Sequence, residues 1–248
     1  MRILTQNYLA DATTSMAGIG WSDGRPVGNI AGINLDDAAE TVGASGTINI
    51  NLGSARKIDG IAISGHNLGD SATVTVRLTA NSNYTGGDLF SMTLRDSGTA
   101  DGKHYVQYMA FDDKTYRYIQ IITNQPGTTI IGNIWIGQHT QITPAVRTGF
   151  TVRYESRDVR LESPTGRVMG DKGRVLRSAQ LSFPKTDTET VETVRRIYDR
   201  LGTVTPLVLL YADDDGGVVP PMYCYISEFS ETPRPPKSEY TLTFREGR

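Results

Sequence analysis

Polar and apolar residues alternate along much of the first 140 positions of this 248-residue chain. Residues 72–78 (ATVTVRL) place every second side chain on one apolar face, which is the period of a half-buried strand. Similar alternation, or a run rich in β-branched and aromatic residues, is found at 47–52, 58–64, 105–111, 116–123 and 129–136. Gly, Asn, Asp and Ser cluster between these segments and predict turns. Many short strands separated by turns indicate an antiparallel β-sandwich.

A second set of strand-like segments follows a polar, proline-containing stretch at residues 140–146. This stretch predicts a domain boundary, with one domain at 1–143 and another at 144–248. The strands of the second domain are expected at 149–154, 159–162, 175–183, 207–211, 222–229 and 240–244.

One segment of the second domain has helical rather than strand spacing. Its apolar residues fall on one helical face: Val191, Val194, Ile197, Tyr198 and Leu201. Thr186 and Glu189 have the spacing of a capping box, and Gly202 is a typical C-terminal stop. We therefore expect a helix at 187–201 beside a C-terminal β-sandwich, in a chain that is mainly β.

The charge of the chain is nearly balanced, with 25 basic and 27 acidic residues and a formal net charge of −2. Such a balance provides no long-range field that would attract nucleic acid or an anionic membrane surface, so neither is an expected partner. No apolar run approaches the roughly 20 residues that span a bilayer, and residues 1–7 lack the apolar stretch of a secretion signal. The expected place of synthesis is a cytoplasm.

Reactive side chains do not cluster along the sequence. The three histidines, His66, His104 and His139, are far apart, with no carboxylate or cysteine beside them at a metal-ligand spacing. No nucleophile elbow, phosphate loop or dinucleotide-binding glycine pattern is present. The single cysteine, Cys224, lies in an apolar run that is typical of a buried thiol. The sequence therefore predicts a protein that is not an enzyme and has no catalytic residue, metal or cofactor.

Two loops carry alternatives that the sequence leaves open. The run of three carboxylates at 213–215, followed by two glycines, offers oxygens for calcium but is more typical of a solvated hairpin tip. Residues 163–174, which are rich in glycine and basic side chains, are either an arm that reaches a neighbouring subunit or an ordinary hairpin loop.

Asn83-Tyr-Thr85 matches the glycosylation pattern, which we attribute to chance because no secretion signal is expected.

The first 140 residues resemble a known fold family in the order of their segments. "TININLGSARKIDGIAISGHNLGDSATVTVRL", "YRYIQIIT" and "IIGNIWIGQ" are similar to the galactose-binding-like, discoidin-type jelly roll of carbohydrate-binding modules and of many tailed-phage structural proteins. In that family ligands bind in loops at one end of the sandwich. Carried over by position, the resemblance makes Trp21, His66, Asn67, Asp70 and Tyr84 the candidate ligand-binding residues.

The "GHNL" turn at residues 65–68 also has a structural interpretation, which the sequence favours. An asparagine side chain after a strand can bond backbone groups of the turn, and the imidazole of His66 can satisfy neighbouring carbonyls. Trp21 is likewise more typical of a core residue than of a sugar platform.

The second domain resembles the tail-tube-like domain of tailed phages, in "PLVLLY", "YCYISEF" and "YTLTFRE". Together the two resemblances imply a structural protein of the virion, at the distal tail, tail tip or baseplate, made in the host cytoplasm. They imply a homo-oligomeric ring, six copies being usual for the family, that contacts tail tube and tail tip proteins.

Two other functions remain open. The main alternative is a carbohydrate-binding module that contacts host surface glycans, which would require an open, aromatic-lined loop pocket. The structural hypothesis expects Trp21 and Tyr84 to be buried instead. A weaker alternative is an ancillary domain of a glycan-degrading enzyme, which would require two carboxylates that face one cleft.

Overall fold

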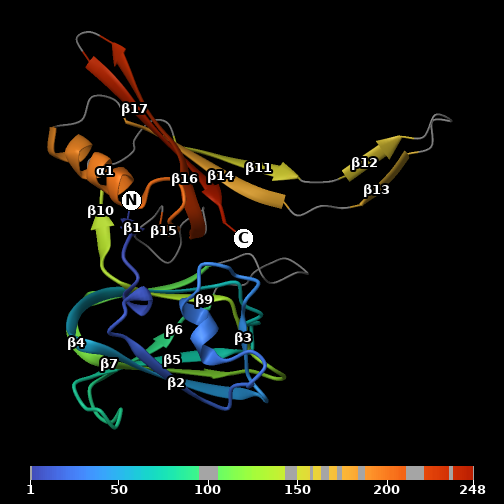
Figure 1. The fold of residues 1–248 in the computed structure, drawn as a ribbon, viewed down its shortest axis with the longest axis vertical. Helices are drawn as coiled ribbons and strands as arrows, with labels where there is room; N and C mark the ends of the chain where they lie inside the picture. Colours follow the sequence, from blue (N-terminus) through green and yellow to red (C-terminus); the bar gives the residue numbers. More distant parts are fainter. Residues whose placement is uncertain are drawn as a thin grey trace. The chain divides into compact units, whose positions relative to one another are not determined.

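The computed structural model describes residues 2–94, 106–142, 150–156, 159–162, 168–171, 175–183, 188–210, 221–234 and 237–247. The chain forms two compact units (Figure 1). Residues 1–141, 207–223 and 248 make up the first, and residues 142–206 and 224–247 make up the second. The described residues are mostly antiparallel strands, with one α-helix, and confirm the mainly-β fold class. None of their helices is long and apolar enough to span a membrane.

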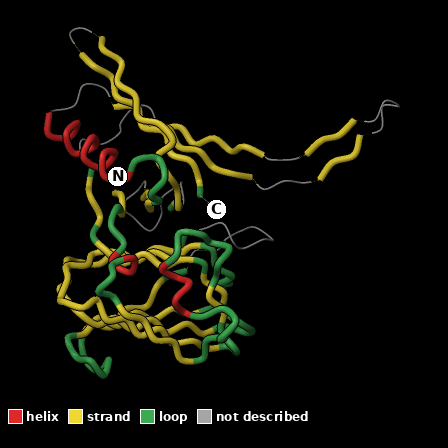
Figure 2. The backbone as a smooth tube through the Cα atoms, viewed as in Figure 1, coloured by secondary structure: helices red, strands yellow, loops and turns green. Residues whose placement is uncertain are grey.

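The first unit is a β-sandwich built around two long strands, β4 (Ser45–Ser64) and β7 (Gln107–Asn124). They pair in the order β2-β4-β7-β5-β6, and β9 also pairs with β4. The shorter strands are β2 (Ser15–Ile19), β5 (Thr73–Thr79), β6 (Asp88–Met92) and β9 (Asn133–Gly137). Figure 2 shows how little helix this unit has: η1 (Tyr8–Ala10) and η2 (Val27–Ala31) are short 3-10 turns.

Register shifts bend both long strands at the same place. The pairing of β4 with β7 is interrupted between Asn51 and Arg56, and again between Ile58 and Gly60. Bulges of this kind increase the local twist and turn a strand out of its sheet. Each long strand therefore runs on past a corner, and residues 58–64 of β4 lie beyond it.

The core of the first unit follows from this bend. Before the corner, β4 alternates, with Ile48 and Ile50 fully buried. Beyond the corner all seven residues from Ile58 to Ser64 are buried, so this part of β4 is covered on both faces. The main cluster also includes Val76, Ile121, Ile134 and Ile136 among others. Each such side chain stabilises the fold by about 1.5–3 kcal/mol relative to leaving it exposed.

Three further strands of the first unit come from distant parts of the sequence. β1 (Arg2–Leu4) pairs with β10 (His139–Gln141) and with β15 (Leu207–Leu210), antiparallel in both cases. One hydrophobic cluster joins them: Leu4, Ala62, Val106, Trp135, Val208, Leu210 and Tyr223. Residues 207–223, which the sequence analysis assigned to the second domain, therefore group with the first unit, because β15 extends the pairing of β1.

Two short strands complete the first unit. β3 (Ala39–Glu40) pairs with β8 (Ile130–Ile131).

The second unit is an antiparallel sheet with one helix. Its strand order is β16-β17-β14-β11, from β11 (Phe150–Ser156), β14 (Val175–Phe183), β16 (Met222–Arg234, in this unit from Cys224) and β17 (Lys237–Glu246). A separate two-stranded ribbon is formed by β12 (Val159–Glu162) and β13 (Val168–Asp171).

The helix α1 (Thr188–Leu201) lies within the predicted range of 187–201. Its predicted apolar face is the buried one, with Val191, Val194, Ile197 and Leu201 below 10% exposure. The ring of Tyr198 packs 5.4 Å from that of Phe229 on β16. The helix ends as expected, because Gly202 takes a left-handed φ of +56° and its N–H donates to the carbonyl of Tyr198.

Some predicted features lie outside the described residues. They are the three carboxylates at 213–215, residues 163–167 and 172–174 of the glycine-rich loop, His104, and Thr186 of the capping box. Cys224 is described and is fully buried, as predicted.

Candidate functional site

The turn that contains His66 begins at Gly65, where neighbouring residues leave little room for a side chain. Gly65 has a φ of +64°, and a Cβ there would lie 3.2 Å from the Cβ of Leu35 and 3.3 Å from the Cα of Gly132. His66 follows and is fully buried, with its Nδ1 accepting a hydrogen bond from the N–H of Leu68 at 3.1 Å. This nitrogen serves a backbone N–H rather than a carbonyl, in contrast to the expectation for the imidazole.

Asn67 joins this turn to residues 125–130. Its Nδ2 donates to the carbonyl of Thr128 at 2.9 Å. Its Oδ1 accepts from the N–H of Ile130 at 2.7 Å and from Nε2 of Gln125 at 3.1 Å. Both acceptor positions of the amide are therefore used inside the fold. Asp70 at the end of the turn is exposed.

The two aromatic candidates are partly buried and also contact the fold. Trp21 donates from Nε1 to the carbonyl of Thr47 at 3.1 Å and packs against the main core cluster. Tyr84, which has a left-handed φ of 59°, meets the ring of Tyr118 edge to face at 5.7 Å. Burial raises the pKa of the Tyr84 hydroxyl, and Tyr118 adds to the shift. Neither ring is among the large hydrophobic side chains that stand exposed.

The strand register places the five candidates at two opposite ends of the sandwich. Asn124 pairs with Ser45 and with Thr73, whereas Tyr118 pairs with Asn51 and with Thr79. The first end holds the His66–Asp70 turn, which bonds Gln125, and Trp21, which bonds Thr47. Tyr84 packs on Tyr118 and so lies at the second end. The single cluster of loops that the resemblance implies is therefore split.

A cavity that the sequence did not indicate lies at the second end, at the corner of the long strands. Its volume is about 390 Å³, and it is lined by Arg2, Asp59, Ala110, Phe111, Asp112, Asp113 and His139. The pairs Ile58 with Lys114 and Gly60 with Ala110 leave residues 111–113 of β7 opposite the single residue Asp59 of β4. A bulge re-aims the side chains of its extra residues. This bulge therefore brings four lining residues to one place.

Asp59 is the most deeply buried ionisable side chain of the cavity, at 8% exposure. Its Oδ1 accepts from the backbone N–H of His139 at 2.8 Å and lies 2.9 Å from Nδ1 of the same residue. Its second oxygen takes no hydrogen bond from the residues that the structure describes. A buried carboxylate is held where hydrogen bonds compensate its desolvation, so the His139 contacts fix Asp59 at the cavity wall.

The rim of the cavity carries an ion pair. Nζ of Lys57 contacts Oδ2 of Asp113, and both side chains are about half exposed. The hydrogen bond to Asp113 raises the pKa of Lys57, and the charges of Asp113 and Asp59 add to the effect. Asp112 is exposed beside them. The ring of Phe111 is partly buried and stacks on Phe90 at 5.2 Å.

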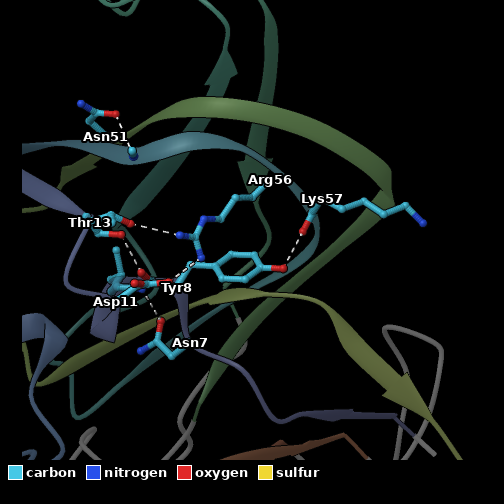
Figure 3. A network of polar contacts seen from close by, with 10 residues as sticks. Asn7, Tyr8, Asp11, Thr13, Asn51, Arg56 and Lys57 are labelled. Carbon is cyan, nitrogen blue, oxygen red and sulfur yellow. Dashed lines mark hydrogen bonds and ion pairs between the residues drawn. The ribbon is translucent and has the colours of Figure 1, made fainter.

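A polar network supports the same corner (Figure 3). Arg56 contacts Oδ2 of Asp11 at 2.7 Å and Oγ1 of Thr13 at 3.1 Å, and its guanidinium lies 5.0 Å from the centre of the Tyr8 ring. The hydroxyl of Tyr8 donates to the carbonyl of Lys57 at 3.1 Å, so η1 is tied to the strand beside Asp59. The Arg56 hydrogen bond lowers the pKa of Asp11. Burial raises the pKa of Tyr8, and Arg56 opposes that shift.

The described residues of this corner do not form a group of histidine, cysteine and carboxylate side chains that could hold a metal ion. The lining brings together the carboxylates of Asp59 and Asp112, the side chain of Arg2 and the ring of Phe111. One residue could have drawn attention to this part of the sequence, although the sequence analysis did not select it. Asp59 is a carboxylate inside the buried segment 58–64, where an ionisable group needs a partner.

Comparisons with known proteins find similar folds only. No family model matches the chain, and a search of curated proteins finds no match. Three solved structures illustrate the likeness: a family 32 carbohydrate-binding module from Clostridium perfringens in complex with GalNAc-β-1,3-galactose, one from the C. perfringens protein NanJ in complex with galactose, and the lectin domain of lectinolysin complexed with Lewis B antigen.

These likenesses cover 54–55% of this chain and 98–100% of the other chains. The sequence identities are 9%, 16% and 14%, and the TM-scores are 0.42, 0.40 and 0.42. Values this low carry no argument about a ligand, so the function of this chain is argued below from its own residues.

Proposed function

We propose that the chain is a non-enzymatic structural protein that forms a homo-oligomer through its second unit. The tail tip of a tailed phage, with six copies in a ring beside tail tube and tip proteins, is the setting that the sequence resemblance implies. The observation that carries the proposal is a two-stranded ribbon at the edge of the second unit (Figure 1).

The ribbon is a hairpin that continues past its sheet. β11 pairs with β14 from Phe150 opposite Leu181 to Ser156 opposite Val175, and β12 then pairs with β13 from Val159 opposite Asp171. The third strand, β17, pairs with β14 only at residues 178–183. Beyond that point the described hairpin has no further strand beside it.

A buried ion pair marks the place where the third strand stops. Arg177 contacts Oε1 of Glu246, near the end of β17, from both Nη2 and Nε, at 2.7 and 3.1 Å. Both side chains are below 10% exposure. Farther out, Tyr154 is 65% exposed and Val175 is 44% exposed.

An isolated two-stranded hairpin is at best marginally stable in water. Exposed aromatic and β-branched side chains on an open edge strand are also a template for pairing with another chain. Both features are accounted for if the ribbon packs on a neighbouring subunit. A second copy is the simplest neighbour, since a closed ring uses the same contact in every subunit and leaves no edge open.

The mass of the full chain in solution, measured by light scattering across a concentration series, tests this proposal. We expect a defined multimer. Replacing residues 157–174 by Asn-Gly connects the facing residues Ser156 and Val175 by a two-residue hairpin turn. This variant should keep its circular dichroism spectrum and have the mass of one chain. A full-length chain that stays monomeric at every concentration, alone and with proteins encoded beside it, would contradict the proposal.

A matched pair of substitutions refines the test. Tyr154→Lys places a charge on the exposed part of β11 from which the ribbon continues, and should weaken the multimer. Val204→Lys alters a residue of the same unit that is 76% exposed but lies after the helix. It should leave the mass unchanged, and equal effects of the two would argue against the ribbon as the contact.

The second candidate function is carbohydrate binding by the first unit. The residues that the resemblance selects give it little support, because His66, Asn67 and Trp21 make hydrogen bonds within the fold. The observation that favours it is the cavity at the opposite end, which contains both hydrogen-bond donors and acceptors and an aromatic ring. Binding of a glycan by the full chain, seen as a change in its amide NMR spectrum, tests this candidate.

A further inference from the structure

We infer that the cavity around Asp59 is a binding site for one neutral, hydroxyl-rich ring, that is, a saccharide unit. This inference rests on the second candidate function and is independent of assembly through the ribbon. It differs from the resemblance in placing the ligand at the corner of β4 and β7, away from the His66 turn.

The size and openness of the cavity suit a small ligand. A volume of about 390 Å³ is at the lower end of the roughly 300–1,000 Å³ that is typical of small-molecule sites. The bulge at residues 111–113 and the Asp59–His139 contact form its walls within the first unit. These walls are built by backbone pairing, so the site is formed before a ligand arrives.

The buried carboxylate points to a ligand with hydroxyl groups. Asp59 is more than nine-tenths buried, and its His139 contacts both use Oδ1. The second oxygen has no hydrogen bond from the described residues and is not fully enclosed, so a group in the cavity can reach it. A hydroxyl group of a ligand can donate a hydrogen bond to it.

The charges of the lining favour a neutral ligand over an anion. Asp59, Asp112 and Asp113 disfavour an anion, since like charges repel in a partly desolvated site. Asp113 is already paired with Lys57, and the charge of Arg2 offsets part of the remaining negative charge, so the pull on a cation is reduced. A neutral ligand that both donates and accepts hydrogen bonds fits such mixed charges.

The aromatic residue gives the cavity a non-polar surface as well. Phe111 lines the cavity, and its stacking on Phe90 fixes the plane of its ring. A sugar ring has both a hydroxyl-bearing edge and a C–H face, and the C–H face can pack on an aromatic side chain. Asp59 and Phe111 together therefore match the two kinds of surface on one saccharide unit.

The test is a titration of the full chain, labelled with nitrogen-15, with D-galactose and D-glucose, followed through its amide resonances. We expect at least one of these sugars to shift the amides of Asp112 and His139, with a dissociation constant on the order of 1 mM. Galactosamine and galacturonate serve as charged probes and should bind more weakly. Shifts confined to residues 66–70, tighter binding of either charged probe, or no shift with any probe would overturn the inference.

Substitutions separate a direct role from a structural one. Asp59→Asn keeps an oxygen for the His139 N–H but replaces the second acceptor by an amide, and should weaken binding about tenfold. Phe111→Leu should weaken it by a similar factor. Asp70→Asn, at the other end of the sandwich, is the matched control and should change nothing.

The assembly proposal and this inference can be tested separately, because either one can be wrong while the other is right. The variant with Asn-Gly in place of residues 157–174 should bind the sugars as the full chain does. Asp112→Asn, at an exposed lining residue, should weaken binding and leave the mass of the multimer unchanged. An Asp59→Asn variant that stays folded and binds as tightly as the parent would refute the site.

Discussion

The two ends of the first unit use polar residues in opposite ways. At the end with the His66 turn, the side chain of Asn67 makes three hydrogen bonds to residues 125–130, and the imidazole of His66 is fully buried. At the corner with Asp59, a bulge places ionisable side chains around a cavity, and one oxygen of a buried carboxylate takes no hydrogen bond from the described residues. The polar groups at the first end are used within the fold, whereas those at the second end line a cavity, where we propose that a ligand binds.

The difference between the two ends indicates which parts of this β-sandwich leave polar side chains available to a ligand. A histidine-asparagine pair in a turn attracts attention in the sequence, but a turn that follows a buried strand has backbone groups to satisfy, and polar side chains are used for that purpose. A cavity forms instead where two long strands lose register and their side chains diverge. The comparison can be tested by changing each end separately.

The largest effect is expected for Asn67→Ala. The change removes three hydrogen bonds: the N–H of Ile130 loses its side-chain acceptor, and the carbonyl of Thr128 and the amide of Gln125 keep only their bond to each other. It should lower the free energy of unfolding by about 3 kcal/mol. Urea unfolding measures it. Asp70→Ala in the same turn should change stability by less than about 0.5 kcal/mol. Similar values for the two would show that the turn is not held by Asn67.

A somewhat smaller effect is expected for Gly65→Ala. The left-handed φ of +64° and the contacts that a Cβ would make with Leu35 and Gly132 should together cost about 2 kcal/mol. Gly69→Ala is a suitable control, because a Cβ there meets no atom within 4 Å. Thermal unfolding of the two variants compares them. An equal cost would mean that the close approach at Gly65 can be relieved.

The sequence predicts the strands and the helix well where local pattern decides them. The alternation at residues 72–78 corresponds to β5 at 73–79, and the helical face from Val191 to Leu201 is the buried face of α1. These elements can be read locally because burial of one face repeats with a fixed period. The sequence also predicted that the Asn67 side chain bonds backbone groups, but not that those groups belong to residues some sixty positions away.

The cavity could not be predicted in the same way. Asp59 meets residues 111–113 because the register of β4 against β7 shifts there, and His139 reaches it through an N–H 80 residues away. No local pattern encodes a register between distant strands. For the same reason the sequence did not separate Tyr84 from the His66 turn, or group residues 207–223 with the first unit.

At the second end, Asp59→Asn should cost little stability. The substitution keeps an acceptor for the His139 N–H but replaces the carboxylate, which lies 2.9 Å from Nδ1 of the same residue, by an uncharged amide, at a cost of about 1 kcal/mol. This cost should be well below that of Asn67→Ala, because the fold depends less on this end. Urea unfolding of the two variants side by side gives the ratio. A larger loss of stability for Asp59→Asn than for Asn67→Ala would show that the fold depends more on the second end than on the first.

The smallest expected effect is on the pH dependence of stability, through the ion pair between Arg56 and Asp11. The Arg56 hydrogen bond lowers the pKa of Asp11 in the folded state below its ordinary value of 3.8. A carboxyl group with a lowered pKa stabilises the fold at pH values above the unfolded pKa, and this contribution disappears as the pH falls through the folded pKa. The parent should therefore be slightly more stable than Asp11→Asn near neutral pH, with the difference vanishing below pH 3.8. Unfolding curves of the two proteins across that range measure it. A difference that grew on acidification would mean that Arg56 does not stabilise the charged form of Asp11.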